Sequence, residues 1–151
     1  MDRTRTFFAQ QHDLLLGLLG WGVGSVVVGI GLARQRSEVL RQIGIQAIVW
    51  GAIDALLAWS GRLGARQHQT LVATPAPDPD EIKAARSFQR LVALNAGLDL
   101  LYIAGGLRLA RERRADRRGI GIGIAIQGLF LLIYDSLLVW WSTRWRAARD
   151  Q

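Results

Sequence analysis

The hydrophobic residues of this chain are gathered into four long blocks, and the charged residues lie almost entirely between them. The blocks cover about residues 14–33, 43–60, 90–109 and 119–141. A helix needs roughly 20 residues, and at least about 17, to cross about 30 Å of hydrocarbon. Backbone groups in lipid must be paired within their own segment. The pattern therefore predicts an all-α membrane protein, a four-transmembrane-helix bundle, in one integral membrane domain over residues 1–151.

Short arginine-rich connections join the blocks in pairs. The first connection reads "RQRSEVLRQ" and the second reads "RLARERRADRR", so each pair of spans is expected to form a helical hairpin. A proline-rich linker over about residues 73–79 separates the hairpins. Pro79 suits the first turn of the third helix, and the acidic Asp80 and Glu81 favour the positive end of its dipole.

The second and fourth spans share a motif, "IQAIVWGAID" against "IQGLFLLIYD". Gln46 and Asp54 have the same spacing as Gln127 and Asp135. The first and third spans share "GIGLAR" against "GLRLAR" more weakly. A hairpin that occurs twice would be a parallel repeat about an axis along the membrane normal, with Gln46 near the level of Gln127 and Asp54 near the level of Asp135. The alternative is chance similarity between apolar helices.

The charge pattern favours a membrane and not nucleic acid. The formal net charge is +7, and lysine occurs only at Lys83. Arginines beside apolar spans anchor helices at lipid headgroups, and no basic, aromatic soluble face points to nucleic acid. The nine arginines near the two hairpin loops predict cytoplasmic loops and non-cytoplasmic termini. The absence of cysteine excludes disulfides and thiolate chemistry.

Three carboxylates, Asp54, Asp99 and Asp135, interrupt the apolar spans at similar depths. An ionised Asp at mid-bilayer costs about 2.5–3.5 kcal/mol on insertion scales, so the three should face one another inside the bundle. No lysine or arginine lies at that depth, so they require protons or a cation. The same buried polar layer, a possible ion or ligand site, is expected to include Asn95, Gln46, Gln127, Tyr102 and Ser25.

Three functions fit such a layer. Neutral polar groups can hold helices together in a non-enzymatic accessory or scaffold protein, which the sequence favours because it has no serine, histidine and acid set for nucleophilic catalysis. A proton or hard-cation site is the second, and chemistry on a lipid-soluble ligand is the third. No metal site is expected and no cofactor is indicated. The expected partners are the bilayer, a membrane protein or second copy, and a lipid, quinone or pigment.

The motifs "WGAID", "NAGLDLLYIAGGL" and "GIGIAIQGLFLLIYD" resemble an uncharacterised family of small four-helix bacterial membrane proteins, a domain of unknown function. The resemblance extends over nearly the whole chain, and it implies a place in the bacterial cytoplasmic (inner) membrane. In that family an amide often occupies the position of Asp54, which implies that this position needs a hydrogen-bonding group more than a charge. The resemblance implies a fold and leaves the activity open.

Overall fold

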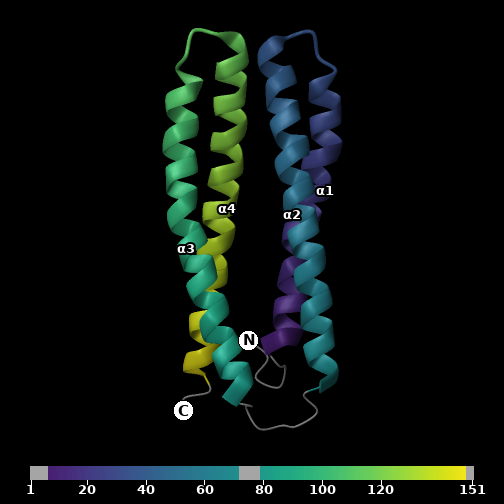
Figure 1. The fold of residues 1–151 in the computed structure, drawn as a ribbon, viewed down its shortest axis with the longest axis vertical. Helices are drawn as coiled ribbons and strands as arrows, with labels where there is room; N and C mark the ends of the chain where they lie inside the picture. The colour runs from purple at the N-terminus through teal and green to yellow at the C-terminus, as the bar shows by residue number, and fades with distance from the viewer. Residues whose placement is uncertain (1–6, 72–78, 149–151) are drawn as a thin grey trace.

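The computed structural model describes residues 7–71 and 79–148, and these residues form four helices. They are α1 (Phe7–Ala33), α2 (Glu38–Leu71), α3 (Pro79–Ala110) and α4 (Ala115–Ala147), as Figure 1 shows. Each helix is long and apolar enough to cross a membrane. The prediction of a four-helix, multi-pass membrane bundle is confirmed.

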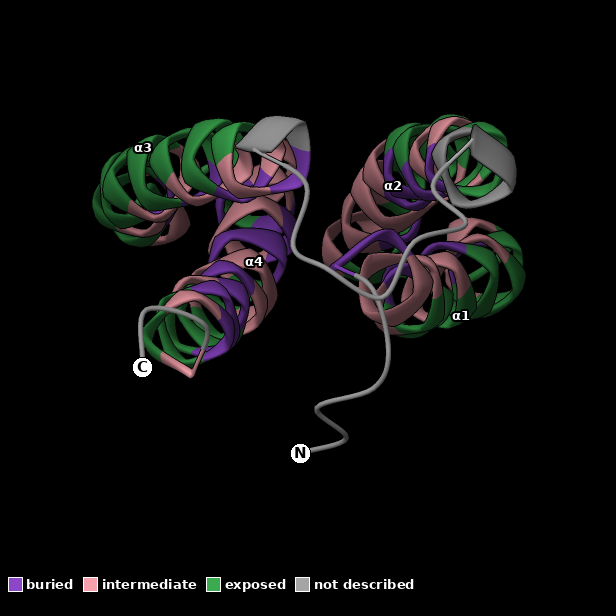
Figure 2. Ribbon diagram, turned by 90° about the horizontal axis from the view of Figure 1, so that it is seen from below, coloured by how far each residue is buried: buried purple, intermediate pink, exposed green. Residues whose placement is uncertain are grey.

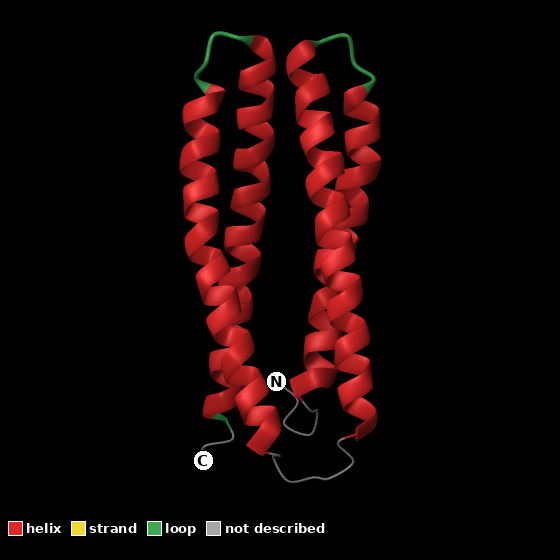
Figure 3. Cartoon of the chain, in the orientation of Figure 1, coloured by secondary structure: helices red, strands yellow, loops and turns green. Residues whose placement is uncertain are grey.

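The helices pack as two hairpins, α1 on α2 and α3 on α4. The two short loops lie at one end of the bundle, and α1 begins and α4 ends at the other (Figure 3). Each loop starts with a tight turn, in which Gln35 N donates to Leu32 O and Arg111 N donates to Arg108 O. The predicted pairing of the spans is therefore confirmed.

The helices extend beyond the apolar blocks. α1 begins at Phe7, α2 continues to Leu71, and α4 continues to Ala147. These ends lie outside the part of each helix that the hydrocarbon must cover. Their side chains can therefore be polar while the backbone continues as a helix. The predicted linker falls almost entirely outside the described residues, and α3 begins at Pro79, where the sequence placed its first turn.

Glycines set the close approach of the helices within each hairpin. A Cβ at Gly44 of α2 would lie 2.4 Å from Ala33 N, and a Cβ at Gly121 of α4 would lie 2.3 Å from Ala110 N. Small residues allow membrane helices to approach this closely. The two contacts are equivalent, because Gly44 and Gly121, like Ala33 and Ala110, are 77 positions apart.

The hairpins meet mainly through α2 and α4. A Cβ at Gly123 would lie 2.6 Å from Gln46 Cβ, so Gln46 is level with Gly123 and about one turn, roughly 6 Å, from the level of Gln127. The expectation that Gln46 lies near the level of Gln127 holds to within about one helical turn. Contacts at glycines, and not the shared "IQ" motif, fix the register between the two helices.

A buried aromatic cluster, named here the end cluster, joins all four helices at the end opposite the loops. Buried residues lie on the faces that the helices turn toward one another, whereas exposed residues dominate the outer faces (Figure 2). Beside the cluster, a Glu81 oxygen of α3 accepts a hydrogen bond from Phe7 N at the start of α1. The buried members of the cluster are Phe7, Phe8, Ala65, Ala85, Trp141 and Trp145.

Candidate functional site

Within the four apolar blocks of the described helices, four polar side chains are buried. Asp54 and Asp99 are each 3% exposed, and Gln127 and Asp135 are also buried. They come from α2, α3 and α4. The cost of placing a carboxylate in lipid explains why these groups occupy the interior of an otherwise apolar bundle.

A chain of hydrogen bonds links three helices through Gln127. Trp21 Nε1 of α1 donates to Gln127 Oε1 at 3.2 Å. Gln127 Nε2 of α4 donates in turn to Asp54 Oδ2 of α2. Both ends of the Gln127 amide are therefore engaged, and the chain ties the first hairpin to the second.

The three carboxylates are neighbours. Asp99 and Asp135 each lie close enough to Asp54 to interact with it electrostatically, and they also interact with each other. Asp99 Oδ2 is buried and has no hydrogen-bond partner in the part of the chain that the structure describes. Among the same residues, no group of three or more His, Cys, Asp or Glu side chains is placed to hold a metal ion. The three carboxylates thus affect one another electrostatically, but they are not arranged as a metal cage.

The other predicted site residues lie nearer the surface. Gln46, Asn95 and Ser25 are half-buried, and Gln46 Oε1 accepts a hydrogen bond from Trp50 Nε1 at 3.2 Å. The expectation that Tyr102 belongs to the buried layer is wrong, because its side chain is 43% exposed.

The position of Tyr102 has a packing cause. A Cβ at Gly128 of α4 would lie 3.2 Å from Tyr102 Cβ, so the base of the side chain borders the α3–α4 contact. The ring instead contacts the Trp50 ring edge to face, with centroids 5.5 Å apart. Tyr102 therefore covers Trp50 at the side of the bundle and does not enter the acidic cluster.

An aromatic row between α1 and α4 was not expected from the sequence. The Trp21 and Phe130 rings stack with centroids 3.8 Å apart, and Phe130 stacks on Tyr134 at 5.8 Å. Tyr134 also donates a hydrogen bond to Leu14 O at 2.8 Å. One signal was available: Trp21 lies well inside its span, whereas a tryptophan of the membrane interface lies near a span end.

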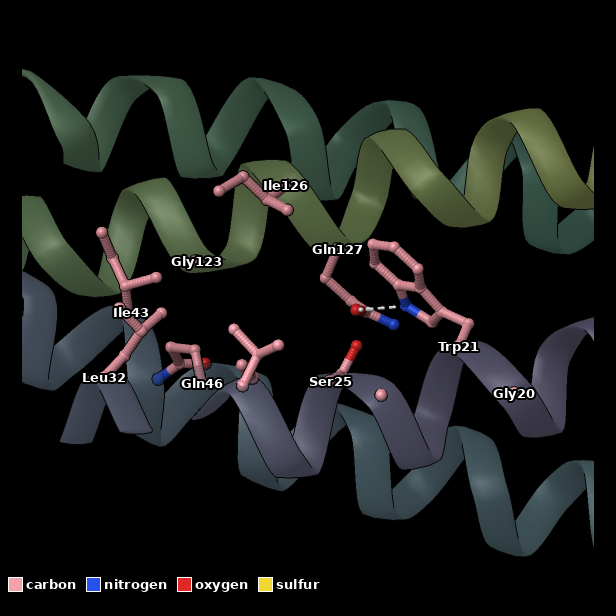
Figure 4. Close-up of a pocket in the computed structure, with 12 residues that line it drawn as sticks. Gly20, Trp21, Ser25, Leu32, Ile43, Gln46, Gly123, Ile126 and Gln127 are labelled. Atoms are coloured by element: carbon pink, nitrogen blue, oxygen red, sulfur yellow. Dashed lines mark hydrogen bonds between the residues drawn. The ribbon is translucent and has the colours of Figure 1, made fainter. Parts of the chain in front are cut away.

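A cavity of about 430 Å³ adjoins the polar layer. Figure 4 shows Trp21 and Gln127 at one end of it and Ser25 directed into the space between α1 and α4. Ser25 and Gln46 contribute further polar groups to a wall that is otherwise apolar. The lining residues are Gly20, Trp21, Gly24, Ser25, Val28 and Leu32 of α1, Ile43, Gln46 and Ala47 of α2, and Gly123, Ile126 and Gln127 of α4.

One family pattern matches this chain. It is described as "Family of unknown function (DUF6992)", and it matches residues 17–136. The chain belongs to this family. The DUF6992 region contains the polar layer and the cavity, but not Phe7, Trp141 or Trp145 of the end cluster. No curated protein and no solved structure gives a significant match.

Proposed function

We propose that the chain is a non-enzymatic accessory or scaffold protein of the bacterial cytoplasmic membrane, in which the polar layer holds two hairpins together as one unit. The observation that carries this proposal is the chain from Trp21 through Gln127 to Asp54. Hydrogen bonds between membrane helices contribute about 0.6–2 kcal/mol each. An amide that bonds side chains of two other helices at once is placed to hold the two hairpins together.

The outer surface supports a role within a larger membrane assembly. Only 17–28% of each candidate span is buried inside the chain. On α3, Gly97 and Gly105 are exposed and have open space around them, which suits the close approach of a helix from another subunit. Light scattering of the protein in mild detergent tests this part of the proposal, and a monomeric mass with no co-purified subunit would contradict it.

A second candidate function is a proton pathway through Asp54, Asp99 and Asp135. The buried Asp99 Oδ2 favours it, because a carboxylate oxygen without a partner can receive a proton. Oxygen ligands also suit hard cations. A proton fits better than a divalent cation, because the described acidic residues are not placed as a metal site.

Replacing Asp54 with asparagine separates the two functions. The asparagine carbonyl can still accept the hydrogen bond from Gln127, but the side chain no longer titrates. If the polar layer is structural, Asp54→Asn is expected to change the free energy of unfolding by less than about 1 kcal/mol. Neither the native protein nor Asp54→Asn should then carry protons across vesicle membranes.

The matched control is Asp116→Asn, which removes an exposed carboxylate at the loop end. Both readouts use the full chain, with unfolding followed in mixed micelles and proton flux in proteoliposomes. Proton flux that is present in the native protein and in Asp116→Asn, but lost in Asp54→Asn at unchanged stability, would favour the second candidate.

We propose that the arginine-rich loops face the cytoplasm and the termini face outward. Short loops rich in arginine are retained on the cytoplasmic side. Single cysteines at Ser37, in the first loop, and at Ala147, at the end of α4, report the two sides, because the native chain has no cysteine. A membrane-impermeant thiol reagent added to intact cells is expected to label Ala147→Cys and spare Ser37→Cys. The reverse pattern would invert the orientation.

We infer that the hairpin is the repeating unit, with a spacing of 77 positions (Gly44 to Gly121 and Gly51 to Gly128). The support lies in matched contacts. Gly51 faces Gly22 O and Ser25 Cβ, while Gly128 faces Asp99 O and Tyr102 Cβ, each at the same spacing. An experimental structure in which the two hairpins superpose with a different residue pairing would contradict this spacing.

A further inference from the structure

We propose that the cavity between α1, α2 and α4 binds a neutral, lipid-soluble molecule whose head is a carbonyl-bearing ring, of the prenylated quinone class. This binding site goes beyond the accessory role, and it stands whether or not the chain joins a larger assembly.

The cavity has the size and the walls of a small-molecule site. Its volume of about 430 Å³ lies within the range of roughly 300–1,000 Å³ that is typical of ligand pockets. Gly20, Gly24, Val28 and Ile126 are exposed at its edge, so the opening is on the lipid-facing surface. A ligand dissolved in the bilayer can therefore enter from the side.

Two side-chain groups in the cavity wall are available to donate hydrogen bonds. The Gln127 amide is engaged at both ends, and Gln46 Oε1 is taken by Trp50. Within the described part of the chain, the Ser25 hydroxyl and the Gln46 amide nitrogen have no partner. Two donors in an apolar wall favour a ligand that presents acceptor oxygens, such as the carbonyls of a quinone ring.

Charge and depth narrow the ligand class. None of the described lining residues is ionisable, so the site offers nothing to a charged lipid headgroup. Counted at 1.5 Å per residue, Ser25, Gln46 and Gln127 lie within roughly 8 Å of the middle of their apolar blocks. The ester carbonyls of phospholipids lie near the membrane interface, about 15 Å from the middle of the hydrocarbon. A neutral carbonyl ring that dissolves in the hydrocarbon fits this depth.

Glycines on α1 give the cavity its depth. Gly22 and Gly29 pack directly on α2, whereas a Cβ at Gly20 or Gly24 would meet no atom within 4 Å. Gly20 and Gly24 therefore serve no close contact within the chain. They instead leave open the wall beside Trp21, whose ring stacks on Phe130 on one face and also lines the cavity, where a ring-shaped head can contact it.

Binding of decylubiquinone to the full-length protein in lipid nanodiscs tests the proposal, with quenching of tryptophan fluorescence as the readout. The native protein is expected to show saturable quenching above the linear background of quinone dissolved in lipid. Gly24→Leu fills the cavity and is expected to weaken binding at least 10-fold. Ser25→Ala removes one donor and is expected to weaken it about 5- to 10-fold. Gly64→Leu is the matched control, because it adds the same side chain to open space on α2, outside the cavity lining.

Phenyldecane, which has a ring and a tail but no carbonyl, is the ligand control. It is expected to compete with decylubiquinone for the cavity, with an affinity at least 10-fold weaker than that of decylubiquinone. Thermal stability is measured for each variant, and Ser25→Ala decides the question if Gly24→Leu does not fold. Linear quenching alone, equal competition by phenyldecane, or unchanged affinity in a folded Ser25→Ala would each overturn the proposal. The proposal would also be overturned if Gly24→Leu left quinone affinity unchanged but altered the mass of the protein assembly. The glycine face of α1 would then bind a helix of another subunit and not a quinone.

Discussion

Alanine in place of Trp145 is expected to destabilise the bundle by about 3–5 kcal/mol, which is the usual cost of removing a large aromatic side chain from a packed core. Trp145 is 2% exposed and packs edge to face against Phe7 of α1, with ring centroids 5.2 Å apart. Since the end cluster contains residues of all four helices, the loss weakens the contact between the hairpins as well as within them.

Trp140→Ala is the matched control, because it removes the same side chain from the same helix at a position that is 57% exposed. Its effect on the free energy of unfolding is expected to be below about 1 kcal/mol. Equilibrium unfolding in mixed micelles measures both variants. Equal losses for Trp140→Ala and Trp145→Ala would mean that the end cluster is not the core of the bundle.

Leucine in place of Gln127 is expected to cost about 2–4 kcal/mol. The substitution leaves the Asp54 carboxyl and the Trp21 indole N–H without their partners, and a buried polar group without a partner costs about 1–3 kcal/mol. The same unfolding measurement applies, and the expected loss is larger than for any exposed polar residue of the bundle.

Gln89→Leu is the control for this variant. Gln89 also joins two helices, because its Nε2 donates to Thr143 Oγ1 at 2.7 Å, but this bond is exposed. Water can replace an exposed partner, so we expect a loss below about 1 kcal/mol. If Gln127→Leu is as stable as Gln89→Leu, the buried amide contributes no more to the free energy of unfolding than an exposed one does.

The fold was predictable because the length and spacing of the apolar blocks determine it. Apolar blocks long enough to cross hydrocarbon must be helices, and short loops force neighbouring helices into hairpins. The packing at the end of the bundle opposite the loops was not predictable in the same way. The end cluster draws Phe7, Ala85 and Trp145 from segments far apart in the sequence, and no local pattern shows that they meet.

The acidic part of the candidate site was predictable for an energetic reason. Asp54, Asp99 and Asp135 cannot face lipid at low cost, and all three are buried. Hydrogen-bond partners and register were not predictable. Trp21 reaches Gln127 across the gap between hairpins, and Tyr102 lies outside because α3 packs on α4 at its base. Both outcomes depend on how glycines bring the helices together, which helical spacing within one span does not reveal.

A double-mutant cycle between Asp54 and Gln127 tests the central claim, that a buried polar layer joins the two hairpins. The free energy of unfolding is measured in mixed micelles for the native chain, Asp54→Leu, Gln127→Leu and the double variant. If the two side chains bond as described, the double variant loses less than the sum of the single losses, by about 0.6–2 kcal/mol. Losses that add to within about 0.5 kcal/mol would show that the two side chains do not interact, and would contradict the claim.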